Sequence, residues 1–126
     1  MANIFIVEDD LVLCEIYKDI FDLTKHKIIG IAHNGLLAIK MFKEFIIKPD
    51  LVIMDYRMPE MNGRETAIKI RELKPEIKII FASADESVRE SCFFEGVYAF
   101  KVKPFSITRL LKNVENALGC LEISIY

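Results

Sequence analysis

Five short apolar segments alternate along the chain with five longer amphipathic segments, and this alternation limits the possible folds. The apolar segments are rich in β-branched residues and predict strands over 3–7, 27–32, 51–55, 78–83 and 98–102. The other segments carry apolar side chains at helical spacing and predict helices over 11–23, 34–46, 63–74, 85–96 and 106–118. Continuous apolar strands separated by helices are typical of a parallel sheet covered on both faces. We therefore predict an α/β domain of five βα units.

Length and charge exclude several classes of protein. A chain of 126 residues fits one domain, and a net charge of −2 with interspersed acids and bases argues against a dedicated nucleic-acid or polybasic membrane surface. No apolar run approaches the roughly 18 residues of a membrane span. The first predicted strand begins too early to leave room for a signal peptide. We expect a cytoplasmic protein without a direct nucleic-acid or membrane partner.

The cysteines and histidines predict no metal or disulfide chemistry. Cys14, Cys92 and Cys120 form no CxxC pair, and an odd number of scattered thiols fits a reducing compartment. We expect all three to be packing residues. His26 and His33 have no catalytic partner in the sequence, and we expect them in loops or at the surface.

Polar residues stand where four of the predicted strands end. Three acids follow the first strand, one acid closes the third, a serine closes the fourth and a lysine lies just past the fifth. When the first strand is central in a doubly wound sheet, these strand ends gather on one rim, where ligands bind in open α/β sheets. The residues are Glu8, Asp9, Asp10, Asp55, Ser83 and Lys103.

Clustered carboxylates with few basic partners repel one another and form a hard, oxygen-rich site that suits Mg²⁺. Lys103 supplies a point charge that can pair with a carboxylate or a phosphate, and Ser83 supplies a hydroxyl donor. Asp55 is the candidate nucleophile, since a carboxylate can accept a phosphoryl group as an acyl phosphate. Asp10 is better explained as the cap of the first helix. The set therefore indicates phosphoryl transfer.

Two alternative readings of the site remain at this point. Each acid on its own could be a helix cap or a solvated loop residue, but a whole set at one rim disfavours that explanation. Nucleotide or flavin binding needs a Gly-rich or Ser/Thr-rich loop after the first strand, to surround phosphate with N–H groups. That loop is "VEDDL" (7–11), which is acidic and contains no glycine.

Several short motifs resemble those of a known family. The motifs are "VEDD" (7–10), "AHNG" (32–35), "DYRMPEMNG" (55–63), "FASA" (81–84), "GVYAF" (96–100) and "KPF" (103–105). In this order and spacing, the chain resembles the receiver domain of two-component response regulators over residues 1 to about 119. The resemblance implies a flavodoxin-like (βα)5 three-layer sandwich with a five-stranded parallel sheet in the order 2-1-3-4-5. We assign residues 1–121 to the receiver domain and 122–126 to a tail of unknown role.

The resemblance also implies residue roles and partners. Asp55 matches the phosphoacceptor, Lys103 the phosphate-pairing lysine, and Ser83 and Phe100 the switch residues. The lysine is followed by a proline, and this Lys–Pro bond is typically cis in the family. A histidine kinase or phosphotransfer protein would donate the phosphoryl group, and the face of the fourth helix, fifth strand and fifth helix would bind a downstream protein target or effector domain. The only chemistry implied is self-phosphorylation and self-dephosphorylation. The Mg²⁺ ligands implied are Glu8, Asp9, Asp55 and the backbone carbonyl of Arg57.

Some positions depart from common family patterns. Phe100 stands where tyrosine is frequent, so a hydroxyl bond to a partner is unavailable. Many DNA-binding relatives carry two acids after the equivalent of Gly96, and "GVYAF" lacks them, which puts their charged dimer interface in doubt. Arg57 and Asp85 occupy positions that tune self-dephosphorylation in the family.

Three alternative functions fit a chain of this kind. A small-substrate phosphatase or phosphotransferase usually carries a second Asp two residues after the nucleophile, where this chain has Arg57, together with a cap that no insertion here could form. A receiver-shaped scaffold would act without phosphorylation. The chain could also be a receiver fragment of a larger regulator or hybrid kinase. The tail alternates Leu121, Ile123 and Ile125 with polar residues, which fits a strand, a continued helix or the start of a linker.

Overall fold

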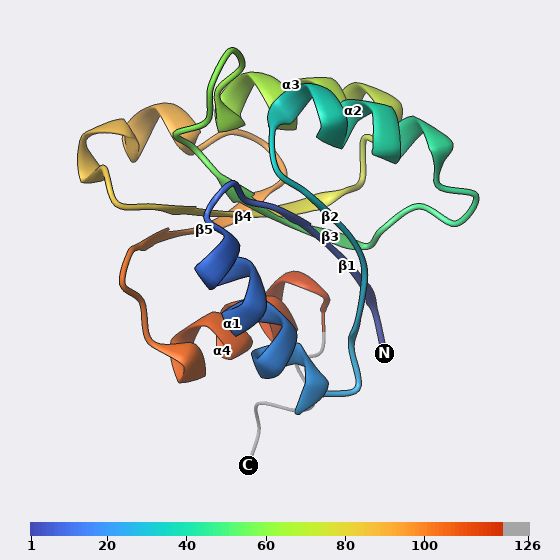
Figure 1. The fold of residues 1–126 in the computed structure, drawn as a ribbon, viewed down its shortest axis with the longest axis vertical. Coiled ribbons are helices and arrows are strands. Elements are labelled where there is room, and N and C mark those ends of the chain that lie inside the picture. The colour runs from blue at the N-terminus through green and yellow to red at the C-terminus, as the bar shows by residue number, and fades with distance from the viewer. Residues whose placement is uncertain (120–126) are drawn as a thin grey trace.

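The computed structural model describes residues 1–119, and its centre is one parallel sheet (Figure 1). The order is β2-β1-β3-β4-β5, and every neighbouring pair is parallel, as the resemblance implied. The central position of β1 and β3 brings their carboxyl ends side by side. The strands are β1 (Asn3–Val7), β2 (Lys27–Ala32), β3 (Leu51–Asp55), β4 (Lys78–Ser83) and β5 (Val97–Val102).

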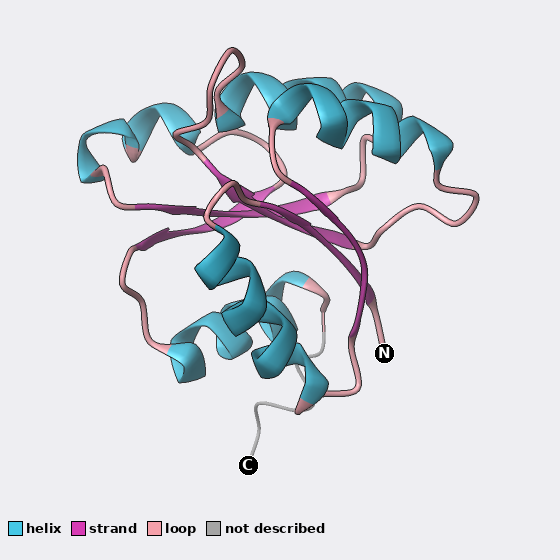
Figure 2. Cartoon of the chain, viewed as in Figure 1, coloured by secondary structure: helices cyan, strands magenta, loops and turns pink. Residues whose placement is uncertain are grey.

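Helices cover both faces of the sheet and complete a three-layer sandwich (Figure 2). In Figure 1, α1 and α4 lie on one face, and α2 and α3 lie on the other. This arrangement confirms the predicted flavodoxin-like fold. The helices are α1 (Leu11–Asp22), α2 (Gly35–Glu44), α3 (Gly63–Leu73) and α4 (Ile107–Ala117), the last of which is the fifth helix of the sequence prediction.

The predicted helix over 85–96 was wrong, because the connection between β4 and β5 forms two 3₁₀ turns. These are η1 (Glu86–Val88) and η2 (Glu90–Cys92). Short polar side chains in this segment form hydrogen bonds with the local backbone, and these compete with the backbone hydrogen bonds of an α-helix. The Asp85 carboxylate accepts from the Ser87 N–H at 3.0 Å, and the Ser91 hydroxyl donates to the Val88 carbonyl at 2.8 Å.

The pleat of the strands divides the core into two apolar layers. On β1, Ile4 and Ile6 pack toward α1 and α4, whereas Phe5 and Val7 pack toward α2 and α3. All four side chains are fully buried, and each contributes roughly 1.5–3 kcal/mol to folding by leaving water. A strand that is apolar on both faces fits an inner position in the sheet, and β1 lies between β2 and β3. Its last residue, Val7, directly precedes the acidic motif.

Two of the three cysteines behave as predicted. Cys14 and Cys92 are buried free thiols, and burial raises the pKa of both. Cys120 lies outside the described residues, as do the alternating tail and the expected boundary at residue 121. Within residues 1–119, no helix is long and apolar enough to cross a membrane.

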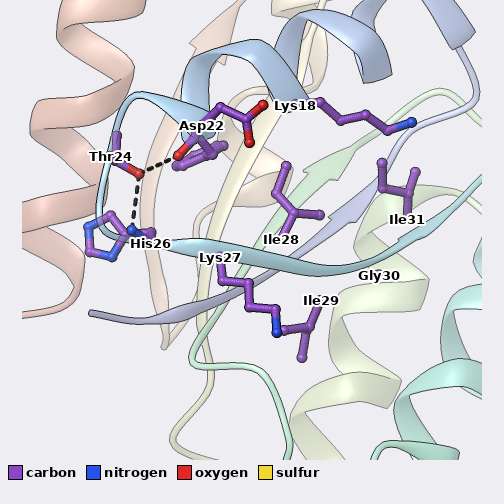
Figure 3. Close-up of a pocket in the computed structure, with 10 residues that line it drawn as sticks. Lys18, Asp22, Thr24, His26, Lys27, Ile28, Ile29, Gly30 and Ile31 are labelled. Carbon is purple, nitrogen blue, oxygen red and sulfur yellow. Dashed lines mark hydrogen bonds between the residues drawn. The ribbon is translucent and has the colours of Figure 1, made fainter.

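His26 lies in a loop, as expected, and it is buried there. Its Nδ1 accepts from the Ala2 N–H at 3.1 Å, and its Nε2 lies 2.5 Å from Oε1 of Glu115 on α4. Figure 3 shows His26 beside Thr24, whose hydroxyl oxygen accepts from the His26 N–H at 3.1 Å. A pocket of about 540 Å³ follows the outer edge of β2 from this point. His26 thus ties the N-terminus to α4, while His33 is exposed as predicted.

Candidate functional site

The acidic motif after β1 separates into two structural roles. Glu8 is buried, and Asp9 is exposed at the rim. Asp10 is the cap of α1, as predicted, because its Oδ1 accepts from the N–H of Val12 at 3.0 Å. The Asp10 N–H in turn donates to Oε2 of Glu8 at 3.1 Å. The start of α1 therefore fixes the Glu8 carboxylate in the rim.

Asp55 is the last residue of β3, between β1 and β4, and its side chain is 5 % exposed. Carboxylate oxygens of Glu8, Asp9 and Asp55 all lie within 4.8 Å of one another. The structure thus brings together the three acids that the sequence placed on one rim. Their donor set fits Mg²⁺, which takes carboxylate oxygens and keeps several waters.

Gly63 fixes the loop that follows Asp55. The Gly63 N–H donates to the Tyr56 carbonyl at 2.8 Å, and a Cβ at this position would lie 2.2 Å from the Asp55 carbonyl oxygen. Asn62 and Glu65 form a capping box that starts α3 at this point. Sequence reasoning assigned Gly63 no role, although a glycine directly after an Asn helix cap is a signal of close backbone approach.

Lys103 directly follows β5, the edge strand next to β4, and its side chain reaches the acids at the ends of β1 and β3. Its Nζ lies 2.8 Å from Oε1 of Glu8 and 3.2 Å from Oδ1 of Asp55. Its backbone N–H donates to the Ser83 carbonyl at 2.9 Å, which holds the end of β5 against β4. The Lys103–Pro104 bond is cis, as the resemblance implied.

Burial and mutual repulsion perturb the acids. Burial, followed by the charge of Glu8, raises the pKa of Asp55 to about 7, although Lys103 opposes the shift. Burial also raises the pKa of Glu8 against the pull of Lys103. Burial works to lower the pKa of Lys103, but its hydrogen bond to Glu8 and the two carboxylate charges raise it overall. One lysine does not neutralise three carboxylates, so the site favours a further cation.

Ser83 ends β4 and is fully buried beside the acids. Asp55 pairs in the sheet with Ala82, the residue before Ser83. The Ser83 hydroxyl oxygen accepts from the Asp85 N–H at 3.1 Å. Among residues 1–119 no hydrogen bond joins Ser83 to Asp55, so the structure brings this side chain to the rim without a hydrogen bond to the candidate nucleophile.

Phe100 lies farther from the acids, in the core layer next to α3. It is 5 % exposed and pairs in the sheet with Phe81 on β4. The guanidinium of Arg89 lies over its ring, 5.6 Å from the ring centre. The aromatic side chain is therefore inside the molecule and covered by a cation.

An ion pair joins two loops of the rim. Nε of Arg57 donates to Oδ2 of Asp85 at 3.0 Å, and the Arg57 Nη2 contacts the same oxygen. The Ser87 hydrogen bonds and Arg57 lower the pKa of Asp85 to about 2. The sequence analysis singled out both positions but did not predict that they pair, because the two residues lie 28 positions apart in the chain. The pair connects the loop after β3 to the loop after β4.

An apolar groove of about 530 Å³ lies next to the acids, between α1 and the loop that leads into α4. Val12 and Ile16 line it from α1, and they are 70 % and 42 % exposed. Lys103 and Phe105 line it from the opposite side. The cation that contacts Asp55 therefore also borders an exposed apolar surface.

The fold and site define a doubly wound α/β domain with a buried acidic cluster and a paired lysine at the carboxyl edge of its sheet. The chain belongs to the response regulator receiver domain family, which residues 4–115 match. This family acts in two-component signalling, and the Glu8, Asp9 and Asp55 cluster fits its phosphorylation site.

Individual relatives support this assignment. The chain is 34 % identical to chemotaxis protein CheY of Listeria monocytogenes, over 93 % of this chain and 98 % of that protein. It is 35 % identical to chemotaxis protein CheY of Thermotoga maritima, over 87 % and 92 %. The crystal structure of response regulator TrrA from Thermotoga maritima, in complex with Mg²⁺ and beryllofluoride, is 31 % identical, with a TM-score of 0.83 over 94 % of this chain and 100 % of that one.

Proposed function

We propose that this chain is a phosphorylation-dependent cytoplasmic switch in which Asp55 accepts a phosphoryl group from a histidine kinase or phosphotransfer protein. The observation that carries the proposal is the contact of Asp55 with Lys103 inside a cluster that also holds Glu8 and Asp9. A buried strand-end carboxylate beside one lysine and two further acids is suited to cation-assisted phosphoryl transfer.

Glu8, Asp9, Asp55 and the backbone carbonyl of Arg57 would hold Mg²⁺. When bound, this ion neutralises charge on the phosphoryl oxygens and on the carboxylates. The fit of the donor set rests on the clustering of the three carboxylates within 4.8 Å and on Lys103, the one lysine that pairs with two of them, Glu8 and Asp55. The Asp10 N–H, which donates to Oε2 of Glu8 at 3.1 Å, helps to orient this carboxylate.

In the transfer step, an Asp55 carboxylate oxygen forms a bond to phosphorus while the P–N bond of the donor phosphohistidine breaks. The electron pair of that bond returns to the imidazole, and an acyl phosphate remains on Asp55. The ammonium of Lys103, 3.2 Å from Oδ1 of Asp55, is in position to pair with a phosphoryl oxygen. Water later cleaves the acyl phosphate, so the chain modifies and restores only itself.

The apolar groove beside Lys103 is the surface we assign to the phosphodonor protein. A donor must bring its phosphohistidine to the open rim, and the groove between α1 and the loop before α4 borders that rim. Exposed Val12 and Ile16 offer apolar area to an amphipathic helix of the donor. This location supports docking there, because contact and phosphoryl transfer can then occur together.

The switch would run from Ser83 to Phe100. A phosphoryl group on Asp55 offers acceptors that the Ser83 hydroxyl can reach by moving toward it, since Ser83 ends the neighbouring strand. Phe100 on the next strand then has space to repack, which changes the face of η1, η2, β5 and α4. The result is a population shift between two packed states that a downstream protein target or effector domain distinguishes.

The experiment that tests this function is an amide NMR titration with Mg²⁺ and then beryllofluoride, which mimics the acyl phosphate. We expect shifts at Asp9, Asp55, Ser83 and Lys103 that extend to Phe100 and α4. The Asp55→Asn variant is the control and should lose the beryllofluoride response. Mg²⁺ binding without any beryllofluoride response would contradict the proposal and favour a receiver-shaped scaffold.

A further inference from the structure

The outer side of β2 is an open edge of the sheet. Within residues 1–119, β2 pairs with β1 alone, so its outer backbone groups face no other strand. After Lys27 the strand contains only apolar residues and glycine, whereas β5 at the opposite edge carries Lys101 within its length. Charged side chains within an edge strand hinder the addition of a further strand. The edge of β2 lacks this protection over residues 28–32.

The pocket of about 540 Å³ beside this edge offers apolar contacts. Phe21 lines it from α1, and the half-buried side chains of Ile28 and Ile31 line it from β2. Figure 3 shows these two isoleucines on the same side of the strand as Lys18 of α1, and Lys27 on the opposite side. A strand added here would therefore bury apolar side chains on one face and place polar side chains on the face of Lys27.

A segment of the chain has this pattern. Residues 120–126, which lie outside the described residues, read "CLEISIY". Leu121, Ile123 and Ile125 alternate with Glu122 and Ser124, which is the period of a strand with one apolar face. At about 3.3 Å per residue, this segment is as long as the six-residue strand β2 when it is extended. Its pattern and its length therefore match the open edge.

Helix α4 brings the chain to the beginning of this edge. Oε1 of Glu115 on α4 lies 2.5 Å from Nε2 of His26, and His26 directly precedes β2. The helix ends at Ala117, and Gly119 has a φ of +76°, the left-handed conformation that commonly ends helices. A strand that starts here and follows β2 runs in the direction of β2, so the added pair is parallel.

The topology of the sheet also selects β2 over β5 as the acceptor. Helices α1 and α4 cover the same face of the sheet (Figure 1). The unit β1–α1–β2 crosses this face in the direction from β1 to β2, and a connection from β5 through α4 to the outer edge of β2 crosses it in the same direction. The two crossovers therefore have the same hand. A parallel strand beyond β5 would have the opposite hand, although about 98 % of such crossovers are right-handed.

We propose that the open edge of β2 binds segment 120–126 of the same chain as a sixth, parallel strand. The three apolar side chains of the segment pack in the pocket beside α1, and Glu122 lies on the face of Lys27, where the opposite charges attract. The added strand covers the unprotected edge against pairing with other chains. The inference goes beyond the proposed function and does not depend on it, because the pocket and the acidic cluster share no residue.

The test is amide hydrogen exchange of the full chain, measured by NMR together with nuclear Overhauser contacts between methyl groups. We expect slow exchange of the outward amides of β2 and of residues 121–125, and contacts between Ile123 and Ile28. Ile123→Asp places a charge against the apolar pocket, so the outward β2 amides should exchange at least tenfold faster. Ser124→Asp places the same charge on the face of Lys27 and should exchange like the parent chain.

Three results would overturn the inference. They are equal exchange of the β2 amides in the parent chain and Ile123→Asp, methyl contacts of Ile123 with a surface other than β2, and protection that disappears on dilution together with a dimer in sedimentation velocity. The last result would assign the edge to a second copy of the chain. Beryllofluoride binding at Asp55, measured on the same samples, should be equal in the parent chain and Ile123→Asp, so failure of this inference is distinct from failure of the proposed function.

Discussion

The ammonium of Lys103 lies 3.2 Å from the Asp55 carboxylate, although 48 residues separate them in the chain. The same ammonium lies 2.8 Å from Glu8, so one cation serves two buried acids from two neighbouring strands. A pair of carboxylates that share a single lysine is under-neutralised. This imbalance determines how the site responds to mutation, to pH and to Mg²⁺.

Removal of the shared cation should destabilise the metal-free protein. Lys103→Met leaves two buried carboxylates without a counter-charge, and we expect the free energy of unfolding to fall by about 1–3 kcal/mol at neutral pH. Urea unfolding with and without Mg²⁺ measures the effect, and Mg²⁺ should restore part of the loss. Lys103→Arg keeps the charge and is the control. An unchanged unfolding midpoint in Lys103→Met would show that the ion pairs carry no net stability.

The raised pKa of Asp55 predicts an unusual dependence of stability on pH. Between its ordinary value of 3.8 and about 7, the folded protein binds a proton at Asp55 that the unfolded chain has released. The unfolding free energy contributed by this group therefore falls as pH rises through that range and stays low above it. In Asp55→Asn this slope should become shallower, with the raised pKa of Glu8 still contributing, and the variant should unfold at a higher temperature than the parent chain at alkaline pH without Mg²⁺.

Thermal unfolding of both proteins across this pH range, in the presence of a chelator, measures the difference. Asp19→Asn is a suitable control, because Asp19 is exposed on α1 and is not part of the acidic cluster. Parallel pH profiles for the parent chain and Asp55→Asn would contradict the assignment of the raised pKa to Asp55.

The fold and most of the rim could be predicted because they follow from local patterns. Alternating apolar runs predicted the sheet, and the rule that parallel strands share a carboxyl edge placed Asp55 and Lys103 together before any distance was known. The predicted helix over 85–96 failed because its periodicity did not reveal that the side chains of Asp85 and Ser91 bond to the local backbone. The burial of His26 was missed because its partner Glu115 lies 89 residues away. Contacts between distant loops, such as that of Arg57 with Asp85, leave no signal at fixed spacing.

Gly63 should be sensitive to the smallest substitution. In Gly63→Ala the new Cβ would lie 2.2 Å from the Asp55 carbonyl oxygen, so the start of α3 or the end of β3 must move. We expect a loss of about 1–3 kcal/mol in unfolding free energy and weaker beryllofluoride binding, since the moved backbone carries Asp55. Glu72→Ala, at an exposed position of the same helix, is the control. Full beryllofluoride affinity in Gly63→Ala would show that the loop adjusts without displacing the carboxylate.

The ion pair of Arg57 with Asp85 should control the lifetime of the acyl phosphate rather than the stability of the fold. Both side chains are at the surface, where an ion pair adds little to folding, yet together they join the two loops that border Asp55. Arg57→Ala or Asp85→Ala should open the rim to water and accelerate loss of phosphate from Asp55 several-fold, with little change in thermal unfolding. Phosphate release after phosphorylation by acetyl phosphate measures the rate. The exchanged double variant Arg57→Asp/Asp85→Arg restores a pair of opposite charges and should return the rate toward that of the parent chain. If the double variant loses phosphate as fast as the single ones, the individual side chains and not their pairing set the rate.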